Sequence, residues 1–231
     1  MENLIPALLG GILVSAGGSA SCAAAKSGAS LADIAGTYEP LPIDFKSGAL
    51  KSTGLPVSVK GLPAPANAEA VDLLDPARLC MPIGPFRMIA EMKKKMEIVP
   101  TDKDVILIFE EKTFGLVRVA RLEHDHNESP PGFQGDSVAQ WEGGSLLIDT
   151  VGFNDVVWLT PDGARHGPSL RLREKITPLQ GGLFLRYEMT AEDPAALPKP
   201  YTYVRIFRKT SEVIQEHECV YNIPTELVRG G

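Results

Sequence analysis

The chain has 231 residues, of which 44% are hydrophobic and 23% are charged, as is usual for a single globular domain. Its net charge of −6 and its aromatic content of only 6% argue against a surface that binds phosphates or stacks on bases, so no nucleic-acid partner is expected. The 22 glycines and 19 prolines predict many turns between short strands.

The first 25 residues predict an export signal. An apolar run over 4–16 is too short to span a bilayer as a helix, and small residues follow it. We therefore expect a periplasmic or secreted protein without a membrane span. Two alternatives stay open at this point: a lipid anchor on Cys22, and a frayed apolar N-terminus on a cytoplasmic protein.

Two cysteines, Cys80 and Cys219, remain after such a signal. Export into an oxidising compartment favours a disulfide between them, which would close a long loop and add about 4 kcal/mol or more in the chain-entropy model. The alternative is a pair of buried free thiols.

Residues 26–95 are predicted to form an irregular segment that packs on the domain after it. The stretch GLPVSVKGLPAPANAEAVDLLDPARLC contains too many prolines for a central strand, because proline cannot donate to the hydrogen-bond ladder. Short helical turns are expected over 66–74 and 87–95.

Residues 96–231 have the pattern of a β domain. Strands are predicted at 97–100, 105–110, 114–122, 137–141, 145–151, 169–176, 183–190, 201–209 and 213–220. Short turns, such as those at 143–144 and 181–182, connect consecutive strands into an antiparallel meander, and eight or nine such strands can close. We therefore expect an all-β, mainly antiparallel, lipocalin-like barrel or half-barrel.

Strand alternation places ionisable groups among apolar ones. Glu174 shares a face with the leucines of 169–176, and Arg118 shares a mostly apolar face of its own strand. Asp149 is also expected in the interior, because both faces of its strand are apolar. A buried carboxylate must be paired or have a raised pKa, so Arg118 and Glu174 are predicted to pair. Such a pair could organise the barrel or form the polar floor of a pocket.

The loop after the strand at 145–151 contains a second cluster. A histidine near carboxylates at a strand end suits proton transfer at neutral pH, so His166 is a candidate proton shuttle and Asp155 its orienting partner. The predicted substrate contacts are Arg118, Trp141, Phe153 and Trp158. The alternatives are a solvated histidine and aromatic side chains that only pack in the core.

His124 and His126 lie two positions apart and would face the same way on a strand, as metal ligands do. No further ligands with a defensible spacing complete the pair, so a metal site is a weak alternative to an exposed polar loop. No metal or other cofactor is expected. The sequence also lacks a phosphate-binding glycine loop, a G-x-S-x-G elbow and an H-E-x-x-H motif, which disfavours nucleotide enzymes, α/β-hydrolases and zinc proteases.

Five stretches of the chain form a pattern when they are taken together. They are GTYEP at 36–40, CMPIGPFRM at 80–88, GDSVAQWEGGSLLIDTVGFND at 135–155, G-x-x-H-x-x-x-L at 163–170 and E-x-x-C at 216–219. The pattern resembles a largely uncharacterised family of exported bacterial proteins with a W-E-G-x-x-L-x-x-x-T-x-G-F-x-D hairpin. This resemblance implies export, is compatible with the disulfide, and draws attention to His166, Asp155 and Glu174. Asp136 stands where family members often have histidine.

These observations favour an exported enzyme that acts on a small, largely apolar organic molecule in the barrel. Cofactor-free acid–base catalysis of the lyase, isomerase, cyclase or hydratase type is expected, with His166 as proton shuttle and Glu174 or Asp149 as a carboxylate of raised pKa. The first alternative is a binding protein of the same fold that performs no chemistry, and a His-ligated metalloenzyme is less favoured. A homo-oligomer is compatible with the sequence.

Overall fold

A computed structural model describes residues 28–42, 74–110, 117–161 and 163–219. The predicted export signal lies outside the described residues, as does all but the last residue of the helical turn predicted at 66–74.

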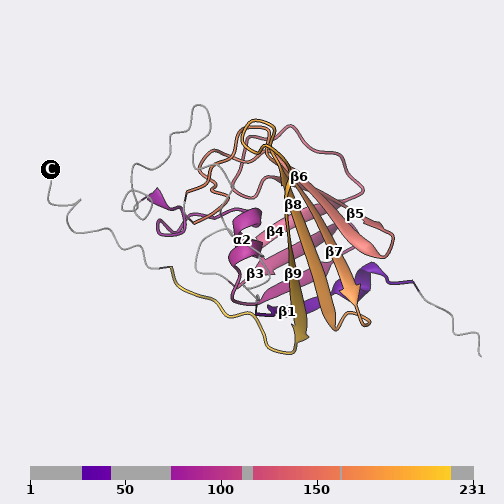
Figure 1. Cartoon of the computed structure of the whole chain (residues 1–231). Coiled ribbons are helices and arrows are strands. Elements are labelled where there is room, and N and C mark those ends of the chain that lie inside the picture. Colours follow the sequence, from indigo (N-terminus) through magenta and orange to yellow (C-terminus); the bar gives the residue numbers. More distant parts are fainter. Residues whose placement is uncertain (1–27, 43–73, 111–116, 162, 220–231) are drawn as a thin grey trace, which may run out of the picture.

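Within these residues, nine β-strands close into a barrel (Figure 1). The strands are β1 (Gly36–Pro40), β2 (Met96–Pro100), β3 (Asp104–Phe109), β4 (Val117–Leu122), β5 (Asp136–Glu142), β6 (Ser145–Val151), β7 (Arg171–Leu179), β8 (Phe184–Glu192) and β9 (Tyr201–Thr210). Each strand pairs with the next along the chain, and β9 pairs with β1 to close the ring. The predicted all-β, lipocalin-like barrel is therefore confirmed.

The strands at the two ends of the domain differ from the prediction. No strand was predicted before residue 97, but β1 pairs with both β2 and β9. The strand predicted at 213–220 is wrong for its described part, because residues 211–219 belong to no strand. The edge of β9 is already occupied by β1, and the chain after it is instead held by the contact of His217 with Glu110 and by the disulfide at Cys219.

One strand pair breaks the predicted antiparallel meander. β4 and β5 run parallel, with Ala120 opposite Ser137 and Leu122 opposite Ala139. Parallel neighbours cannot be joined by a tight turn, so the chain between them must travel back along the barrel. This connection, residues 123–135, is called the crossover segment below.

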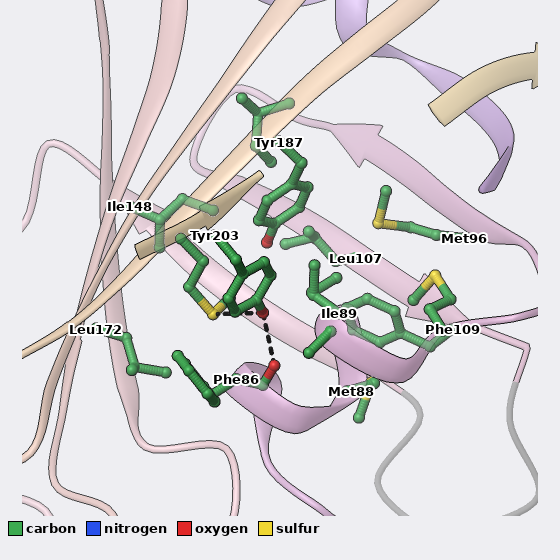
Figure 2. Packing of buried hydrophobic residues seen from close by; sticks show 14 of the residues in the cluster. Phe86, Met88, Ile89, Met96, Leu107, Phe109, Ile148, Leu172, Tyr187 and Tyr203 are labelled. Atoms are coloured by element: carbon green, nitrogen blue, oxygen red, sulfur yellow. Dashed lines mark hydrogen bonds between the residues drawn. The ribbon is translucent and has the colours of Figure 1, made fainter. Parts of the chain in front are cut away.

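A helix lies inside the barrel. Helix α2 (Pro85–Glu91) begins with proline at its first turn, where the missing N–H costs nothing, and six of its seven residues are buried. Figure 2 shows strand side chains packed around Phe86, Met88 and Ile89. These strand residues include Met96, Leu107, Phe109, Ile148, Leu172, Tyr187 and Tyr203. Burial of each large apolar side chain contributes about 1.5–3 kcal/mol, so these contacts make the helix part of the hydrophobic core.

Two polar side chains of β9 fix the helix in place. Tyr203 donates from its hydroxyl to the backbone oxygen of Phe86, at 2.6 Å. Buried Arg205 donates to three carbonyl oxygens at and just beyond the helix end, those of Ile89 (3.0 Å), Ala90 (2.7 Å) and Met92 (3.0 Å). Carbonyl groups at a helix end have no partner within the helix, and a cation there also interacts favourably with the helix dipole.

The predicted disulfide is present. Cys80 and Cys219 are bonded, with their Cα atoms 5.9 Å apart across a separation of 139 residues. A loop of this length corresponds to about 5 kcal/mol of stabilisation in the chain-entropy model. The bond fits an oxidising environment outside the cytoplasm. In the described part of the chain, no helix is long and apolar enough to cross a membrane.

Replacement of Arg205 by methionine should lower the free energy of unfolding by about 3 kcal/mol, because buried carbonyl groups lose their donor. Urea unfolding measures this loss. The control is Arg208→Met on the same strand: Arg208 is exposed and pairs with Glu39, and its loss should cost less than about 1 kcal/mol. Equal losses in the two variants would contradict the anchoring role of Arg205.

Candidate functional site

The predicted ion pair of Arg118 and Glu174 lies inside the barrel. Both side chains are essentially inaccessible to solvent, and they meet through two hydrogen bonds of 2.8 and 2.5 Å. Arg118 also donates to the hydroxyl groups of Ser137 (3.0 Å) and Thr150 (2.5 Å). The hydroxyl of Tyr187 donates to the same carboxylate. Both carboxylate oxygens and all three guanidinium nitrogens of the pair are therefore used by protein groups.

This closed network supports an architectural role for the pair. Burial, followed by the nearby charge of Glu174, raises the pKa of Tyr187 well above its usual value, so the phenol remains a donor. A substrate could reach the carboxylate only by displacing Tyr187 or Arg118. Strand alternation correctly predicted that both charged side chains face inward, but barrel closure decides which groups surround them.

His166 is buried in the loop between β6 and β7. Its Nδ1 contacts the backbone oxygen of Gly167 at 2.7 Å, and its Nε2 contacts the backbone oxygen of Asn154 at 3.0 Å. The N–H of Gly167 donates in turn to the buried carboxylate of Asp193. The imidazole thus connects two loop backbones, and its partners are carbonyl groups rather than the predicted carboxylate.

Asp155 is exposed, and none of the hydrogen bonds among the described residues joins it to His166. Its nearby cation is Arg165, whose guanidinium lies 4.6 Å from the ring centre of buried Trp158. Burial lowers the pKa of Arg165, and the charge of Asp155 opposes this effect. The two residues of the predicted His–Asp pair are therefore close in sequence but have different partners.

Of the other two predicted aromatic contacts, Phe153 packs inside the protein, whereas Trp141 lines the surface groove described below. Phe153 is buried, and its ring meets that of His166 edge to face at 6.2 Å between centres. Trp141 is partly buried, and its indole nitrogen donates to the backbone oxygen of Ala29 at 3.3 Å.

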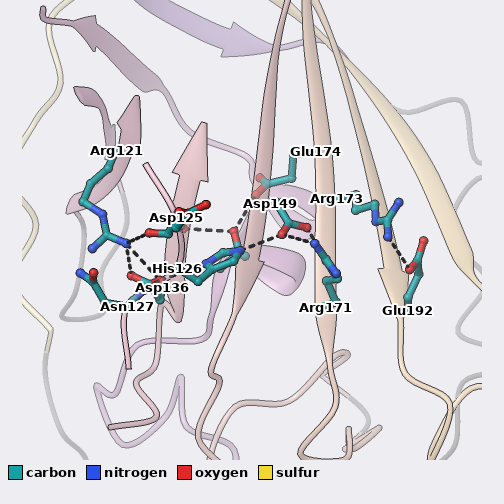
Figure 3. Close-up of polar contacts among 12 residues, drawn as sticks. Arg121, Asp125, His126, Asn127, Asp136, Asp149, Arg171, Arg173, Glu174 and Glu192 are labelled. Carbon is teal, nitrogen blue, oxygen red and sulfur yellow. Dashed lines mark hydrogen bonds and ion pairs between the residues drawn. The ribbon is translucent and has the colours of Figure 1, made fainter. Parts of the chain in front are cut away.

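A different histidine joins carboxylates on the outside of the barrel (Figure 3). His126, in the crossover segment, lies between Asp136 of β5 (3.0 Å from Nδ1) and Asp149 of β6 (2.7 Å from Nε2). Arg121 of β4 pairs with Asp136 at 2.8 Å. Arg171 of β7 binds Asp149 through two contacts of 2.6 Å. Five alternating charges thus cross four strands when the imidazole is protonated.

The position of Asp149 corrects the sequence analysis. It was expected inside the barrel with a raised pKa, but it faces outward, because its neighbour Ile148 is the residue that packs in the core. Partial burial acts to raise its pKa, but hydrogen bonds from Arg171 and His126 outweigh burial and hold the pKa below its usual value. An ionised, paired aspartate of this kind is not the predicted acid.

His124 and His126 do not form the metal pair considered above. Both ring nitrogens of His126 contact carboxylates, whereas His124 is exposed. Among the described residues, no group of three histidine, cysteine, aspartate or glutamate side chains is arranged to hold a metal ion.

An open groove of about 760 Å³ lies over the outer face of β5–β8. Its lining includes outward side chains of Val138, Gln140, Leu147, Asp149, Arg171, Arg173, Lys175, Glu188 and Thr190, with Glu123 and His124 from the crossover segment. Strand β7 contributes positive charge to the groove, because three successive outward positions on it carry cations.

The three cations of β7 differ in how well they are neutralised. Arg171 is held by Asp149, as described above. Arg173 meets Glu192 only at 3.5 Å, with more than half of its side chain exposed. Lys175 forms no ion pair with any described residue, because the glutamate opposite it on β8, Glu188, is bound to Arg186 at 2.6 Å.

No protein-family model matches the chain, and a search of curated proteins gives no match. The resemblance to exported bacterial proteins, drawn from the motifs above, stays a prediction.

Replacement of Glu174 alone by leucine should cost about 3–5 kcal/mol of stability, because it leaves a buried guanidinium without its counter-ion. The double variant Arg118→Met, Glu174→Leu should recover at least about 2 kcal/mol of that loss. Urea unfolding of the two single variants and the double variant measures the coupling. Loss of the partly exposed pair Arg186 and Glu188 provides the comparison, at under about 1 kcal/mol. Strictly additive losses at 118 and 174 would show that the pair is not coupled.

Proposed function

We propose that this protein is an exported binding protein for small organic anions, and that its ligand occupies the groove over β5–β8. The observation that carries the proposal is the row of outward cations on β7, in which Arg173 is weakly paired and Lys175 is unpaired among the described residues.

The geometry of the groove suits a carboxylate attached to a small organic body. Arg173 and Lys175 are two positions apart on one strand, so their Cα atoms are separated by about 7 Å. An arginine can bind a carboxylate through two parallel hydrogen bonds, and a lysine adds a point charge beside it. The nearby Leu147 and Val138 offer apolar contact for the rest of the ligand. The lining also contains five carboxylates, of which those of Asp149, Glu174 and Glu188 are bound to arginines.

Export is the second part of the proposal. It rests on the apolar run and small residues at the start of the sequence and on the Cys80–Cys219 disulfide, which suits an oxidising compartment. We propose that the protein binds its ligand in the periplasm or, if it is secreted, outside the cell.

Binding is favoured over the acid–base reaction predicted from the sequence. That reaction needs His166 and Glu174 to have polar atoms that can reach a substrate. The ring nitrogens of His166 instead contact backbone carbonyl groups. The carboxylate of Glu174 is held by Arg118 and Tyr187. The reaction stays a prediction, and the contacts add no support to it.

Titration with benzoate and with its neutral isostere benzamide tests the proposal. Benzoate should shift amide NMR signals along β6–β8, whereas benzamide should bind at least about tenfold more weakly, because it lacks the charge that the cations recognise. The double variant Arg173→Ala, Lys175→Ala should lose about tenfold in benzoate affinity. Benzoate affinity should also fall as salt is raised, since the contacts are exposed.

The matched control is Arg208→Ala, which removes an exposed, paired arginine outside the groove and should leave benzoate affinity unchanged. Equal affinity for benzoate and benzamide, or unchanged affinity in the double variant, would contradict the anion site.

A further inference from the structure

His126 provides a side-chain contact between the crossover segment and the outer face of the barrel, beside backbone contacts of Glu123, Asp125 and Asn127. Every residue from 123 to 130 is exposed except His126, which lies between two strands. Its nitrogens contact Asp136 on β5 and Asp149 on β6, and among the described residues 123–130 no other side chain forms a hydrogen bond with β6. Because Glu123 and His124 line the groove, the position of this segment determines part of the groove wall.

The contacts of His126 require a proton on each ring nitrogen. A neutral imidazole has one N–H and one lone pair, so it can donate to only one neighbour. Both neighbours here are carboxylates, which only accept when they are ionised. Neutral His126 would place a lone pair against a carboxylate oxygen at 2.7 or 3.0 Å, and that contact would be repulsive.

The charges that face His126 come from every strand packed around it. Arg121 on β4 binds Asp136, and Arg171 on β7 binds Asp149. Asp125, next along the segment, accepts from Arg121 through its backbone oxygen at 3.3 Å, and its exposed carboxyl lies in the same segment (Figure 3). The three cations and two strand carboxylates carry a net charge of +1 when His126 is protonated, and they are neutral when it is not.

The direction of the pKa of His126 agrees with this geometry. Partial burial acts to lower it, but hydrogen bonds with Asp149 and Asp136, and their charges, outweigh burial and raise the pKa above 6.5. The neighbouring Asp136 has a lowered pKa, because the backbone N–H of Asn127 and the side chains of His126 and Arg121 outweigh its burial.

We propose that His126 couples proton binding to ligand binding in the groove. When protonated, it holds the crossover segment against β5 and β6 and adds a positive charge beside Arg171. When it loses that proton, one of its two carboxylate contacts becomes repulsive, the segment is held less tightly at His126, and anion affinity falls. The coupling to anion affinity rests on the proposed anion site, whereas the tethering of the crossover segment by His126 does not.

The raised pKa of His126 determines how the stability of its contacts changes with pH. A histidine that is more basic in the folded protein stabilises its contacts fully below the ordinary histidine value, and this stabilisation is lost as pH rises through the raised value. Tethering and anion binding should therefore both be stronger in mildly acidic than in alkaline solution. Because linkage is reciprocal, an anion in the groove should raise the pKa of His126 further.

Hydrogen exchange of the full chain between pH 5.5 and pH 9 tests the tether without a ligand. The amide of Asn127 donates to Asp136 at 2.9 Å, and its protection, corrected for intrinsic exchange, should fall about tenfold across the titration of His126. In His126→Gln this pH dependence should disappear, whereas the matched variant His124→Gln on the same segment should retain it. NMR titration of the four histidine rings should place His126 above 6.5. A pKa at or below 6.5, or the same pH dependence in His126→Gln, would overturn the proposal.

Benzoate affinity measured at the two ends of the same pH range tests the coupling. It should fall as pH rises in the wild-type protein and stay flat in His126→Gln. If benzoate fails to bind while the segment still responds to His126, the anion site is wrong and the tether stands. If benzoate binds with equal affinity at both ends of the range, the coupling is overturned and the anion site stands.

Discussion

Arg205 donates from inside the barrel to the carbonyl groups at the end of α2, and the rest of the structure depends on this contact. It holds a buried helix where barrels of this size often keep space for a ligand. Because the helix fills that position, the strands close around packed side chains (Figure 2). The charged pair in the interior, Arg118 and Glu174, is then enclosed by hydroxyl groups of the barrel itself. Recognition of a small molecule is consequently proposed on the outer face.

The parallel pairing of β4 and β5 has a similar consequence for the outer face. It forces the chain to return over the barrel, and the returning segment places His126 between two carboxylates that belong to different strands. The same carboxylate, Asp149, neutralises the first of three cations on β7 and leaves the next two more available. The tether and the groove therefore share a residue, and this gives a physical route from proton binding to the charge of the groove.

Strand alternation predicted much of this arrangement. Glu174 and Arg118 were placed inward from the spacing of their apolar neighbours, and the register of the hairpin follows from its turn at 143–144. That register puts Val151 opposite Asp136 and Val138 opposite Asp149, so both aspartates share one face. The face itself was misjudged for Asp149, because Ile148 and Leu147 are equally apolar and alternation alone does not choose between them.

The sequence by itself determined the fold class, the nearly complete set of strands, the inward charges and the cysteine pair, because each depends on local periodicity or on how few residues of one kind are available. Only the tertiary structure decided what those residues contact. β9 meets both β1 and α2 across more than a hundred residues of chain, and His126 reaches Asp149 only because β4 and β5 run parallel. Contacts of this kind depend on how the sheet closes, and periodicity along one strand carries no information about closure.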